Sequence, residues 1–338
     1  MNDRVRVAVL LGGRSSEHDV SIASARSVLA ALDPERYETV TVEIGRDGRW
    51  ELGTGADDQS VAETLPVPTA SVPATLGEVD VVIPVLHGPF GEDGTVQGLL
   101  ELAGVPYVGA GVAASALAMD KDLFKSVMRD HGIPVTRNVT LREGEAAENP
   151  FGYPVFVKPA RLGSSVGITK VAREEELPDA LALAFRHDEK VLIEEFVDGV
   201  EVECSVLGNR EPVASIPGEI VAHGFGAPDW YDYSAKYDEG GMDLIVPPRL
   251  SDETIERIQE LAVRSFVASE CEGMARVDFF VRDGSEVLVN ELNTIPGFTA
   301  TSVYAKLFEA SGLPYAELVN RLVELALERH ERRSRLSY

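Results

Sequence analysis

The sequence predicts a mixed α/β and α+β protein that begins with an open, parallel α/β domain over roughly its first 115 residues. Two observations predict this fold class. The N-terminal part runs twice from an apolar stretch through a glycine-rich turn into a segment with apolar residues at helical spacing. From about residue 155 onward, short apolar stretches with the two-residue alternation of β-strands replace this pattern.

The first N-terminal unit begins with an apolar strand over residues 5–11, which Gly12 and Gly13 follow. Ser16 and Asp19 then match a capping box, in which two side chains satisfy the first N–H groups of a helix. Apolar residues recur at helical spacing as far as Leu32. We therefore expect a helix directly after this box.

The second unit repeats the order of the first. Residues 79–86 form an apolar strand, residues 87–94 a glycine-rich turn, and residues 95–104 a helix. In open parallel sheets, ligands bind at the carboxyl ends of the strands. The two turns therefore bring three polar residues toward one edge of the sheet: Glu17, His87 and Glu92.

Three helices are expected in the rest of the chain. Residues 120–132 have an apolar face and end at Gly132, which suits a helix C-terminus. Residues 251–270 are amphipathic. A last helix runs from Pro314 to about Arg329, and a basic, frayed tail follows it.

Strands separate these helices. One strand ends at Lys158, and two more lie on either side of an Asp-Gly turn at 198–199. A hairpin closes around Asp283-Gly284. Residues 215–248 show no sustained period, which in a compact domain favours a functional loop such as a lid.

Composition excludes several classes of function. The formal net charge of -25 at pH 7 argues against a nucleic-acid backbone as partner. No apolar run approaches the ~18 residues of a membrane span, and the N-terminus lacks the apolar core of a signal peptide. Two cysteines, Cys204 and Cys271, make a disulfide framework improbable. We therefore expect a cytoplasmic protein that binds neither nucleic acid nor a membrane.

Polar side chains gather at one end of the expected hairpin. Because side chains alternate in a strand, Arg276 and Asp278 share a face, and so do Glu291 and Asn293. If the two faces coincide, Asp278, Glu291 and Asn293 form an all-oxygen cluster, which suits Mg²⁺ shared with a phosphate ligand. The alternative is a solvated hairpin end in which Arg276 pairs with Asp278.

A possible phosphate site lies after the strand that ends at Lys158. The loop at 161–168, RLGSSVGI, has small residues whose backbone N–H groups can surround phosphate oxygens. The alternative for Lys158 is an ordinary surface lysine. Neither G-x-x-x-x-G-K-[ST] nor G-x-G-x-x-G occurs at the required place. A nucleotide would therefore be bound by a different fold, between β elements.

Taken together, these features resemble the ATP-grasp superfamily, and within it the D-alanine–D-alanine ligase family. The resemblance extends over nearly the whole chain. Eight stretches carry it, in the family's order: LLGGRSSEHDVS (10–21), HGPFGEDG (87–94), MDK (119–121), FVKPARLGSSVGI (156–168), EEFVDGVEV (194–202), YDYSAKY (231–237), ARVDFF (275–280) and NELNTIPGFTATS (290–302).

The resemblance implies an N-terminal α/β domain over 1–118, followed by a two-subdomain ATP-grasp fold. Its central subdomain covers 119–208 and its C-terminal subdomain 209–338, with a lid loop over 218–248. It also implies that ATP and two Mg²⁺ or Mn²⁺ ions serve to join two D-alanines for peptidoglycan precursor synthesis. The carboxylate of the first D-alanine attacks the γ-phosphorus, and the amine of the second attacks the resulting acyl phosphate. D-lactate or D-serine as second substrate is the alternative, and the YDYSAKY lid favours D-alanine.

The resemblance further implies roles for the residues at matching positions. The nucleotide set is Lys121, Phe156, Lys158, Ser164, Ser165, Glu194, Glu195, Phe196, Val197, Glu201, Phe280, Asn290 and Glu291. The metal set is Asp278, Glu291 and Asn293. The amino-acid set is Glu17, His87, Lys236, Arg276, Gly297, Ser302 and Val303. The catalytic set is Glu17, Ser164, Tyr237, Arg276, Gly297 and Ser302.

Within these sets, Glu17 is implied to bind the first ammonium group, and Arg276 with the Gly297 N–H to hold the developing oxyanion. Lys236 and Ser302 are implied to bind the second carboxylate. Glu17, Ser164 and Tyr237 are implied to form a hydrogen-bonded group when the site closes.

Structural roles stay open for some of these residues taken alone. Glu17 can complement the dipole of the helix that follows it, and Ser302 can cap a helix. A histidine at a strand end, such as His87, can bond to the glycine turn. A further alternative is a nucleotide-binding regulatory protein without turnover, although the complete set of phosphate and metal residues argues against it. We expect an isologous homodimer.

Overall fold

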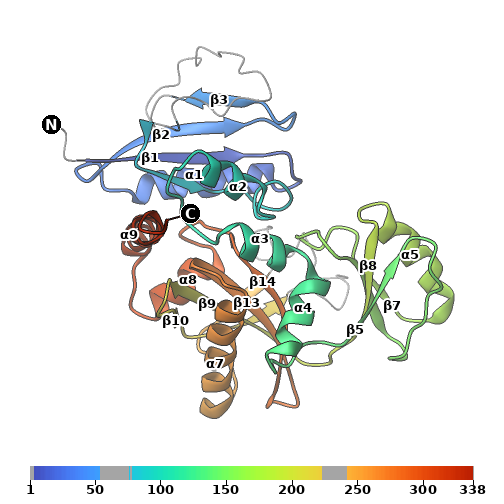
Figure 1. Cartoon of the computed structure of the whole chain (residues 1–338). Helices are drawn as coiled ribbons and strands as arrows, with labels where there is room; N and C mark the ends of the chain where they lie inside the picture. The colour runs from blue at the N-terminus through green and yellow to red at the C-terminus, as the bar shows by residue number, and fades with distance from the viewer. Residues whose placement is uncertain (1–3, 54–75, 77, 223–241, 338) are drawn as a thin grey trace.

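The computed structural model describes residues 4–53, 76, 78–222 and 242–337 and contains three β-sheets with helices packed on them (Figure 1). The N-terminal sheet lies at one end of the molecule, and the other two sheets lie side by side at the opposite end. The mixed α/β and α+β class is therefore confirmed.

The N-terminal sheet has the strand order β3-β2-β1-β4. Its strands are β1 (Val5–Gly12), β2 (Tyr37–Ile44), β3 (Trp50–Gly53) and β4 (Val81–Pro84). β1 pairs in parallel with both β2 and β4, and β3 is antiparallel to β2. The predicted parallel α/β domain is confirmed. The helices of this region are α1 (His18–Ala31), α2 (Thr95–Leu102) and α3 (Val112–Met119).

The capping box predicted at Ser16 and Asp19 is wrong. Helix α1 begins one residue later than the box requires. Glu17 occupies the N-cap position, and its side chain makes no capping hydrogen bond. Asp19 instead pairs with Arg46 at 3.0 Å. The Glu17 side chain is therefore available for contacts outside the helix.

The central sheet is antiparallel and has the order β5-β8-β6-β7. Its strands are β5 (Asn138–Arg142), β6 (Val155–Pro159), β7 (Thr169–Val171) and β8 (Lys190–Glu195). A 3-10 turn η2 (Glu174–Glu176) leads into α5 (Leu177–Phe185), whose apolar residues pack with Val155, Val157 and Ile193 in one core.

The third sheet has six strands, in the order β12-β11-β9-β13-β14 with β10 beside β9. The strands are β9 (Val200–Gly208), β10 (Val213–Ala214), β11 (Gly218–Ala222), β12 (Met242–Ile245), β13 (Gly273–Arg282) and β14 (Glu286–Asn293). Helices α7 (Asp252–Ala268) and α8 (Val303–Ala310) pack on it. The hairpin turn is confirmed, because Asp283 and Gly284 have φ of 52° and 70° between β13 and β14.

The two strands around the Asp-Gly turn are present but do not pair with each other. β8 belongs to the central sheet, whereas β9 lies in the six-stranded sheet between β11 and β13. Residues 196–199 therefore carry the chain from one sheet to the next. At Gly199 a Cβ would lie 2.5 Å from the carbonyl oxygen of Val281, so this end of the link is packed directly on β13.

Helix α4 (Lys121–Asp130) contacts both the central sheet and the six-stranded sheet. Phe124 and Met128 pack in the core of the six-stranded sheet, together with α7. Asp120 caps the helix and accepts from the Leu123 N–H at 3.2 Å. Gly132, with φ of 64°, follows the helix end as predicted.

The final helix, α9 (Tyr315–Ser334), is longer than predicted, and the predicted frayed basic tail is wrong. Arg329 is buried and donates to the carbonyl oxygen of Tyr107 at 2.6 Å. Arg333 pairs with Glu101 at 2.9 Å. The basic residues extend the helix because acceptors from the N-terminal domain satisfy them.

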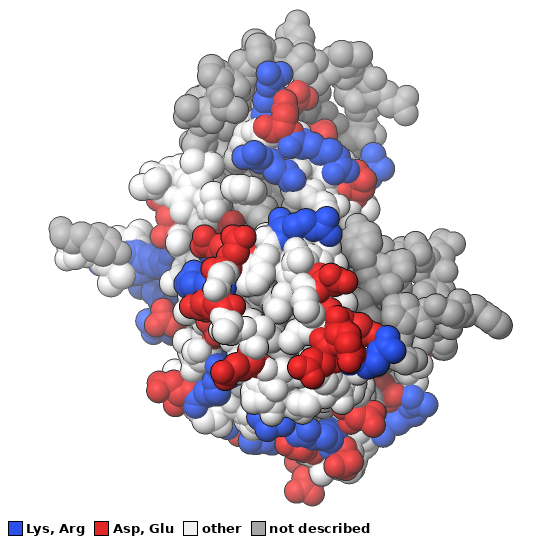
Figure 2. All heavy atoms as spheres, turned by 90° about the vertical axis from the view of Figure 1, so that its right-hand side faces the viewer, with Lys and Arg blue, Asp and Glu red and all other residues white. Residues whose placement is uncertain are grey.

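Among the helices in the described ranges, none combines the length and the apolar character that a bilayer crossing requires. On the described part of the face in Figure 2, both basic and acidic side chains are present.

Candidate functional site

Two cavities meet at the edges of the three sheets. The inter-sheet cavity lies between the central and the six-stranded sheet, and the N-terminal cavity lies between α1 and the loop that follows β14. Four residues line both cavities: Gly163, Ser164, Glu203 and Glu291. A ligand in one cavity can therefore touch a ligand in the other.

The inter-sheet cavity contains most of the residues expected to bind a nucleotide. It is lined by Lys121, Phe156, Lys158, Ser164, Ser165, Glu194, Glu201, Phe280, Asn290 and Glu291. Three expected residues do not line it: Glu195, Phe196 and Val197. β6 and β8 supply one wall and β9, β13 and β14 the other, so strands from both sheets face each other across the cavity.

The lysines of this cavity are buried and have carboxylate partners. Lys158 pairs with Glu194 at 2.5 Å, and Lys125 of α4 contacts the same carboxylate. Lys121 donates to the Leu162 carbonyl oxygen at 2.6 Å and lies 3.5 Å from Glu291. The surface-lysine alternative for Lys158 is wrong, because its side chain is 7% exposed.

The three residues outside the lining belong to the link between the two sheets. Two nitrogens of the Arg137 guanidinium donate to Oε2 of Glu195, with an Nη2–Oε2 distance of 2.7 Å. Burial alone would raise the pKa of Glu195, but hydrogen bonds from Arg137 hold it below its usual range. The Phe196 ring lies 6.1 Å from that of Phe156, and Val197 is buried.

The small-residue loop after β6 has an unusual backbone. Ser164 and Ser165 have φ of 52° and 59°, in the left-handed region that non-glycine residues rarely adopt. Such conformations often occur at functional sites. The Ser164 hydroxyl bonds to the Glu17 carboxylate, so the loop is tied to the N-terminal domain.

The polar cluster at the hairpin end exists. Asp278 and Glu291 are direct cross-strand partners, and the Asn293 amide donates to Asp278 at 3.0 Å. Arg276 also donates to Asp278 at 2.7 Å and lies 2.9 Å from Glu203. The oxygen cluster and the Arg276–Asp278 pair, which were expected as alternatives, therefore occur together.

The donor set of this cluster fits a hard divalent cation. Among the described residues, five carboxylates and two lysines line the inter-sheet cavity, so a polyanionic ligand there would need further positive charge. The Asn290 Oδ1 atom is buried, and the described residues supply no hydrogen-bond partner for it. Within the described ranges no three His, Cys, Asp or Glu side chains form a metal site, and the expected set has only two carboxylates and an amide.

The N-terminal cavity contains every described residue of the expected amino-acid set. It is lined by Glu17, His87, Arg276, Gly297, Ser302 and Val303. Lys236 and Tyr237 lie outside the described residues. Ser302 occupies the N-cap position of α8, as the helix-cap alternative expected, but its side chain makes no bond to the helix N-terminus. Its hydroxyl instead accepts from the Thr299 N–H at 3.0 Å.

His87 presents an acceptor to this cavity. Its Nδ1 lies 2.9 Å from the Ile295 carbonyl oxygen and therefore donates to it, which leaves the lone pair on Nε2. Nε2 is buried and has no partner among the described residues. Burial lowers the pKa of His87, so the ring is neutral at pH 7.

Glu92 is a half-buried acid near this histidine. It accepts from the N–H groups of Gly88 and Ile295 at 3.0 and 3.3 Å. Burial and the neighbouring Glu17 raise its pKa to about 8. The turn at 87–94 predicted that Glu92 lies near this edge, but it was not assigned to the site.

Two further residues of the site, Glu203 and Lys125, were not predicted from the sequence. Glu203 lies two positions after Glu201 on β9, so strand alternation places both on the same face. Lys125 follows Lys121 by one helical turn, which places both on the same side of α4. Their spacing from Glu201 and Lys121, which the resemblance placed in the site, could therefore have identified both residues.

Two family models match the chain. The one described as D-ala D-ala ligase N-terminus covers residues 6–110, and the one described as D-ala D-ala ligase C-terminus covers residues 127–324. Among curated proteins, a D-alanine--D-alanine ligase from Solibacter usitatus is 47% identical, over 98% of both chains. One from Natranaerobius thermophilus is 44% identical, over 99% of this chain and 98% of its own.

Solved structures give the same result. The D-alanine-D-alanine ligase from Coxiella burnetii has a TM-score of 0.83 and 38% identity, covering 98% of this chain and 96% of its own. The D-Ala:D-Ser ligase VanG from Enterococcus faecalis has a TM-score of 0.85 and 37% identity, covering 96% and 99%. A Bacillus anthracis D-alanine--D-alanine ligase complexed with ATP has a TM-score of 0.79 and 28% identity, covering 97% and 99%.

Proposed function

The chain belongs to the D-alanine--D-alanine ligase family, and from this premise we propose that it joins two D-alanines at the expense of ATP. The product is D-alanyl-D-alanine for peptidoglycan precursor synthesis, and ADP and phosphate are released. The observation that carries the proposal is the pair of cavities with four residues in common. A carboxylate bound in the N-terminal cavity can thereby reach the terminal phosphate of a nucleotide bound in the inter-sheet cavity.

We propose that the nucleotide occupies the inter-sheet cavity. Lys121 and Lys158 are buried cations that reach this cavity from different elements, which suits contacts to phosphate oxygens. Glu194 to Val197 would read adenine, chiefly through the backbone, because Glu194 and Glu195 already have basic partners. Glu201 would accept from the ribose hydroxyls.

Asp278, Glu291 and Asn293 would hold one or two Mg²⁺ or Mn²⁺ ions. The ions would neutralise charge on the phosphates and allow two carboxylates to face a polyanion. The acidic lining of the cavity supports this assignment, as does the Asn290 oxygen, which has no partner among the described residues.

The first D-alanine is proposed to lie in the N-terminal cavity with its ammonium group at Glu17. His87 is neutral, and its Nε2 can accept from the same ammonium. The first carboxylate attacks the γ-phosphorus of ATP, which converts a poor acyl donor into an acyl phosphate. Positioning and charge stabilisation account for most catalysis of such a transfer.

The second D-alanine is proposed to lie between Ser302, Val303 and the lid residue Lys236. Its amine attacks the acyl phosphate, and phosphate departs. Arg276 and the Gly297 N–H would hold the oxyanion of the tetrahedral intermediate. Both residues line the cavity beside Ser302, which supports this role. Tyr237 would complete the group of Ser164 and Glu17 when the site closes.

Phosphate release with ATP, Mg²⁺ and D-alanine tests the function. We expect release to depend on D-alanine and the product to have the mass of D-alanyl-D-alanine. Competition among D-alanine, D-serine and D-lactate identifies the second substrate, and we expect the dipeptide to dominate. Release that is equal with and without the amino acid would support a nucleotide-binding protein without turnover.

We also propose that the protein is an isologous homodimer. Phe90, Leu102 and Val112 are large apolar residues that are exposed yet line one shared groove on the N-terminal domain. Arg14 and Glu101 line the same groove, so the surface carries both signs of charge, as a self-complementary contact requires. These residues make a second copy of the chain the proposed occupant.

The domain boundaries at 118 and 208 remain proposals, as does a cytoplasmic location. The location is supported by the use of ATP and by two cysteines, Cys204 and Cys271, that are buried and unpaired.

A further inference from the structure

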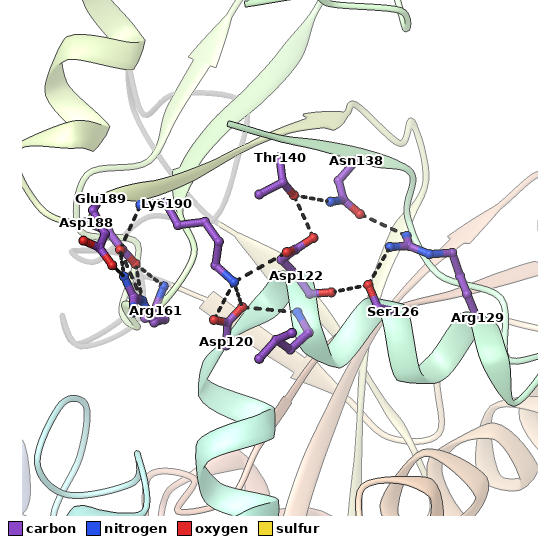
Figure 3. Close-up of polar contacts among 11 residues, drawn as sticks. Asp120, Asp122, Ser126, Arg129, Asn138, Thr140, Arg161, Asp188, Glu189 and Lys190 are labelled. Carbon is purple, nitrogen blue, oxygen red and sulfur yellow. Dashed lines mark hydrogen bonds and ion pairs between the residues drawn. The ribbon is translucent and has the colours of Figure 1, made fainter. Parts of the chain in front are cut away.

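An ion pair joins α4 to the first residue of β8. Lys190 donates to Asp120 at 2.6 Å and lies 3.5 Å from Asp122 (Figure 3). The side chains of Lys190 and Asp120 are 8% and 9% exposed. α4 packs in the core of the six-stranded sheet, whereas β8 belongs to the central sheet. The contact therefore connects the two walls of the inter-sheet cavity.

The same end of β8 holds the small-residue loop. Asp188 accepts from the Arg161 N–H at 2.8 Å and from the Lys190 N–H at 3.0 Å, and it also binds the Arg161 guanidinium (Figure 3). Burial alone would raise the pKa of Asp188, but these hydrogen bonds lower it. The loop that starts at Arg161 is thus fixed to the residues just before β8.

Lys121 contacts the residues on either side of Arg161 and lies next to Asp120 in the chain. Its backbone N–H donates to the Ala160 carbonyl oxygen at 3.0 Å, and its ammonium group donates to that of Leu162 at 2.6 Å. Lys121 directly follows the cap residue Asp120, so a displacement of Asp120 would displace Lys121 as well. The start of β8 therefore sets the spacing between the loop and the lysine, both of which are proposed to contact phosphate.

Asp122 is held independently on its other side. Its Oδ1 accepts from the Thr140 hydroxyl at 2.7 Å, and Thr140 accepts from the Asn138 amide at 3.1 Å (Figure 3). The two carboxylates consequently stay close together, and Lys190 is the cation between them. Without that cation they would repel each other in a largely buried place.

We propose that Lys190 is a positioning residue for nucleotide binding, acting through an ion-pair latch formed by Lys190, Asp120 and Asp122. The latch rests on the proposed function, because it acts through the phosphate contact assigned to Lys121. It holds α4 against β8 so that Lys121 and the loop at 161–168 face the same ligand. Lys190 does not line either of the two cavities.

Steady-state kinetics of Lys190→Met and Lys190→Arg test the latch. We expect Lys190→Met to raise the KM for ATP on the order of tenfold, because a small displacement of a binding group has effects of this size. The KM for D-alanine should rise by at most about threefold. Lys190→Arg keeps the charge and should restore most of the ATP affinity. A general loss of fold would change both substrates together.

Asp120→Asn supplies a second variant in case Lys190→Met does not fold. Asparagine caps a helix as well as aspartate does, so the change removes charge while α4 keeps its start. We expect a smaller rise in the KM for ATP, because Lys190 retains Asp122. Arg173→Met is the matched control: it removes a cation from an exposed pair in the same subdomain and should leave the KM for ATP unchanged.

The latch is refuted if Asp120→Asn and the folded Lys190 variants bind ATP as the wild type does, or if D-alanine is affected as strongly as ATP. Calorimetric measurement of ADP binding distinguishes refutation of the latch from failure of the proposed function. A wild type without D-alanine-dependent phosphate release would overturn the proposed reaction. ADP binding that weakens in Lys190→Met and returns in Lys190→Arg would still support the latch.

Discussion

The buried carboxylate of Glu194 has two basic partners, and removal of the acid should destabilise the fold more than removal of one base. Lys125 is fully buried and Lys158 nearly so, and both contact Glu194. Glu194→Gln removes the carboxylate that these two buried lysines share. In Lys125→Met, Glu194 keeps Lys158 as a partner, and methionine fills similar space.

The structure sets the size of this difference. Loss of one member of a buried ion pair destabilises by about 3–5 kcal/mol when the other is left without a partner. Glu194→Gln falls in this range. In Lys125→Met the remaining defect is mainly the Thr136 hydroxyl that Lys125 contacts, which corresponds to about 1–3 kcal/mol. The two variants should therefore differ by about 2 kcal/mol.

Urea unfolding without nucleotide measures this difference, because the role of Glu194 in binding then has no influence. Glu260→Gln, which changes an exposed pair on α7, is the control and should leave the midpoint unchanged. The reasoning is refuted if Lys125→Met unfolds at the same urea concentration as Glu194→Gln or at a lower one.

Four further variants probe other parts of the molecule. Glu291→Gln should lower turnover by more than about a hundredfold at limiting Mg²⁺ while shifting thermal unfolding little, because a proposed metal ligand is lost; normal turnover would contradict the metal assignment. The raised pKa of Glu92, about 8 against 4.5 in the unfolded chain, means that the folded form binds more protons between these values. Wild-type stability should therefore fall as pH rises from 5 to 8, and Glu92→Gln should show a smaller fall in unfolding midpoints measured across that range; equal slopes would argue against this titration. Leu102→Asp should convert the dimer to monomer in analytical ultracentrifugation, and an unchanged mass would exclude this surface. Lys236→Ala should raise the KM for the second D-alanine more than that for the first, whereas equal rises would remove its assigned role.

Strand alternation predicted the cluster at the hairpin end correctly. The positions of Asp278 and Glu291 follow from two local facts, the turn at Asp283-Gly284 and the two-residue period of each strand. The register then makes them direct partners. The position of Glu203 beside Asp278 could not be predicted in this way, because the two residues lie 75 positions apart on strands whose pairing depends on the order of the sheet.

The errors at helix ends have a related cause. Arg329 continues α9 because its guanidinium finds carbonyl oxygens at Tyr107 and Gly109, more than two hundred positions earlier. The local sequence shows only a run of basic residues, which on its own predicts fraying. At the start of α1, Glu17 contacts Ser164, which lies 147 positions later, and a local capping pattern does not contain this contact.

The covalent link between β8 and β9 has a consequence for turnover. Gly199 is packed on β13 at one end, and Phe196 contacts Phe156 at the other. Rotation about the few bonds between them would part the two sheets and, in the same movement, shift the backbone proposed to hold the adenine ring. With such a hinge, release of ADP would coincide with separation of the two sheets.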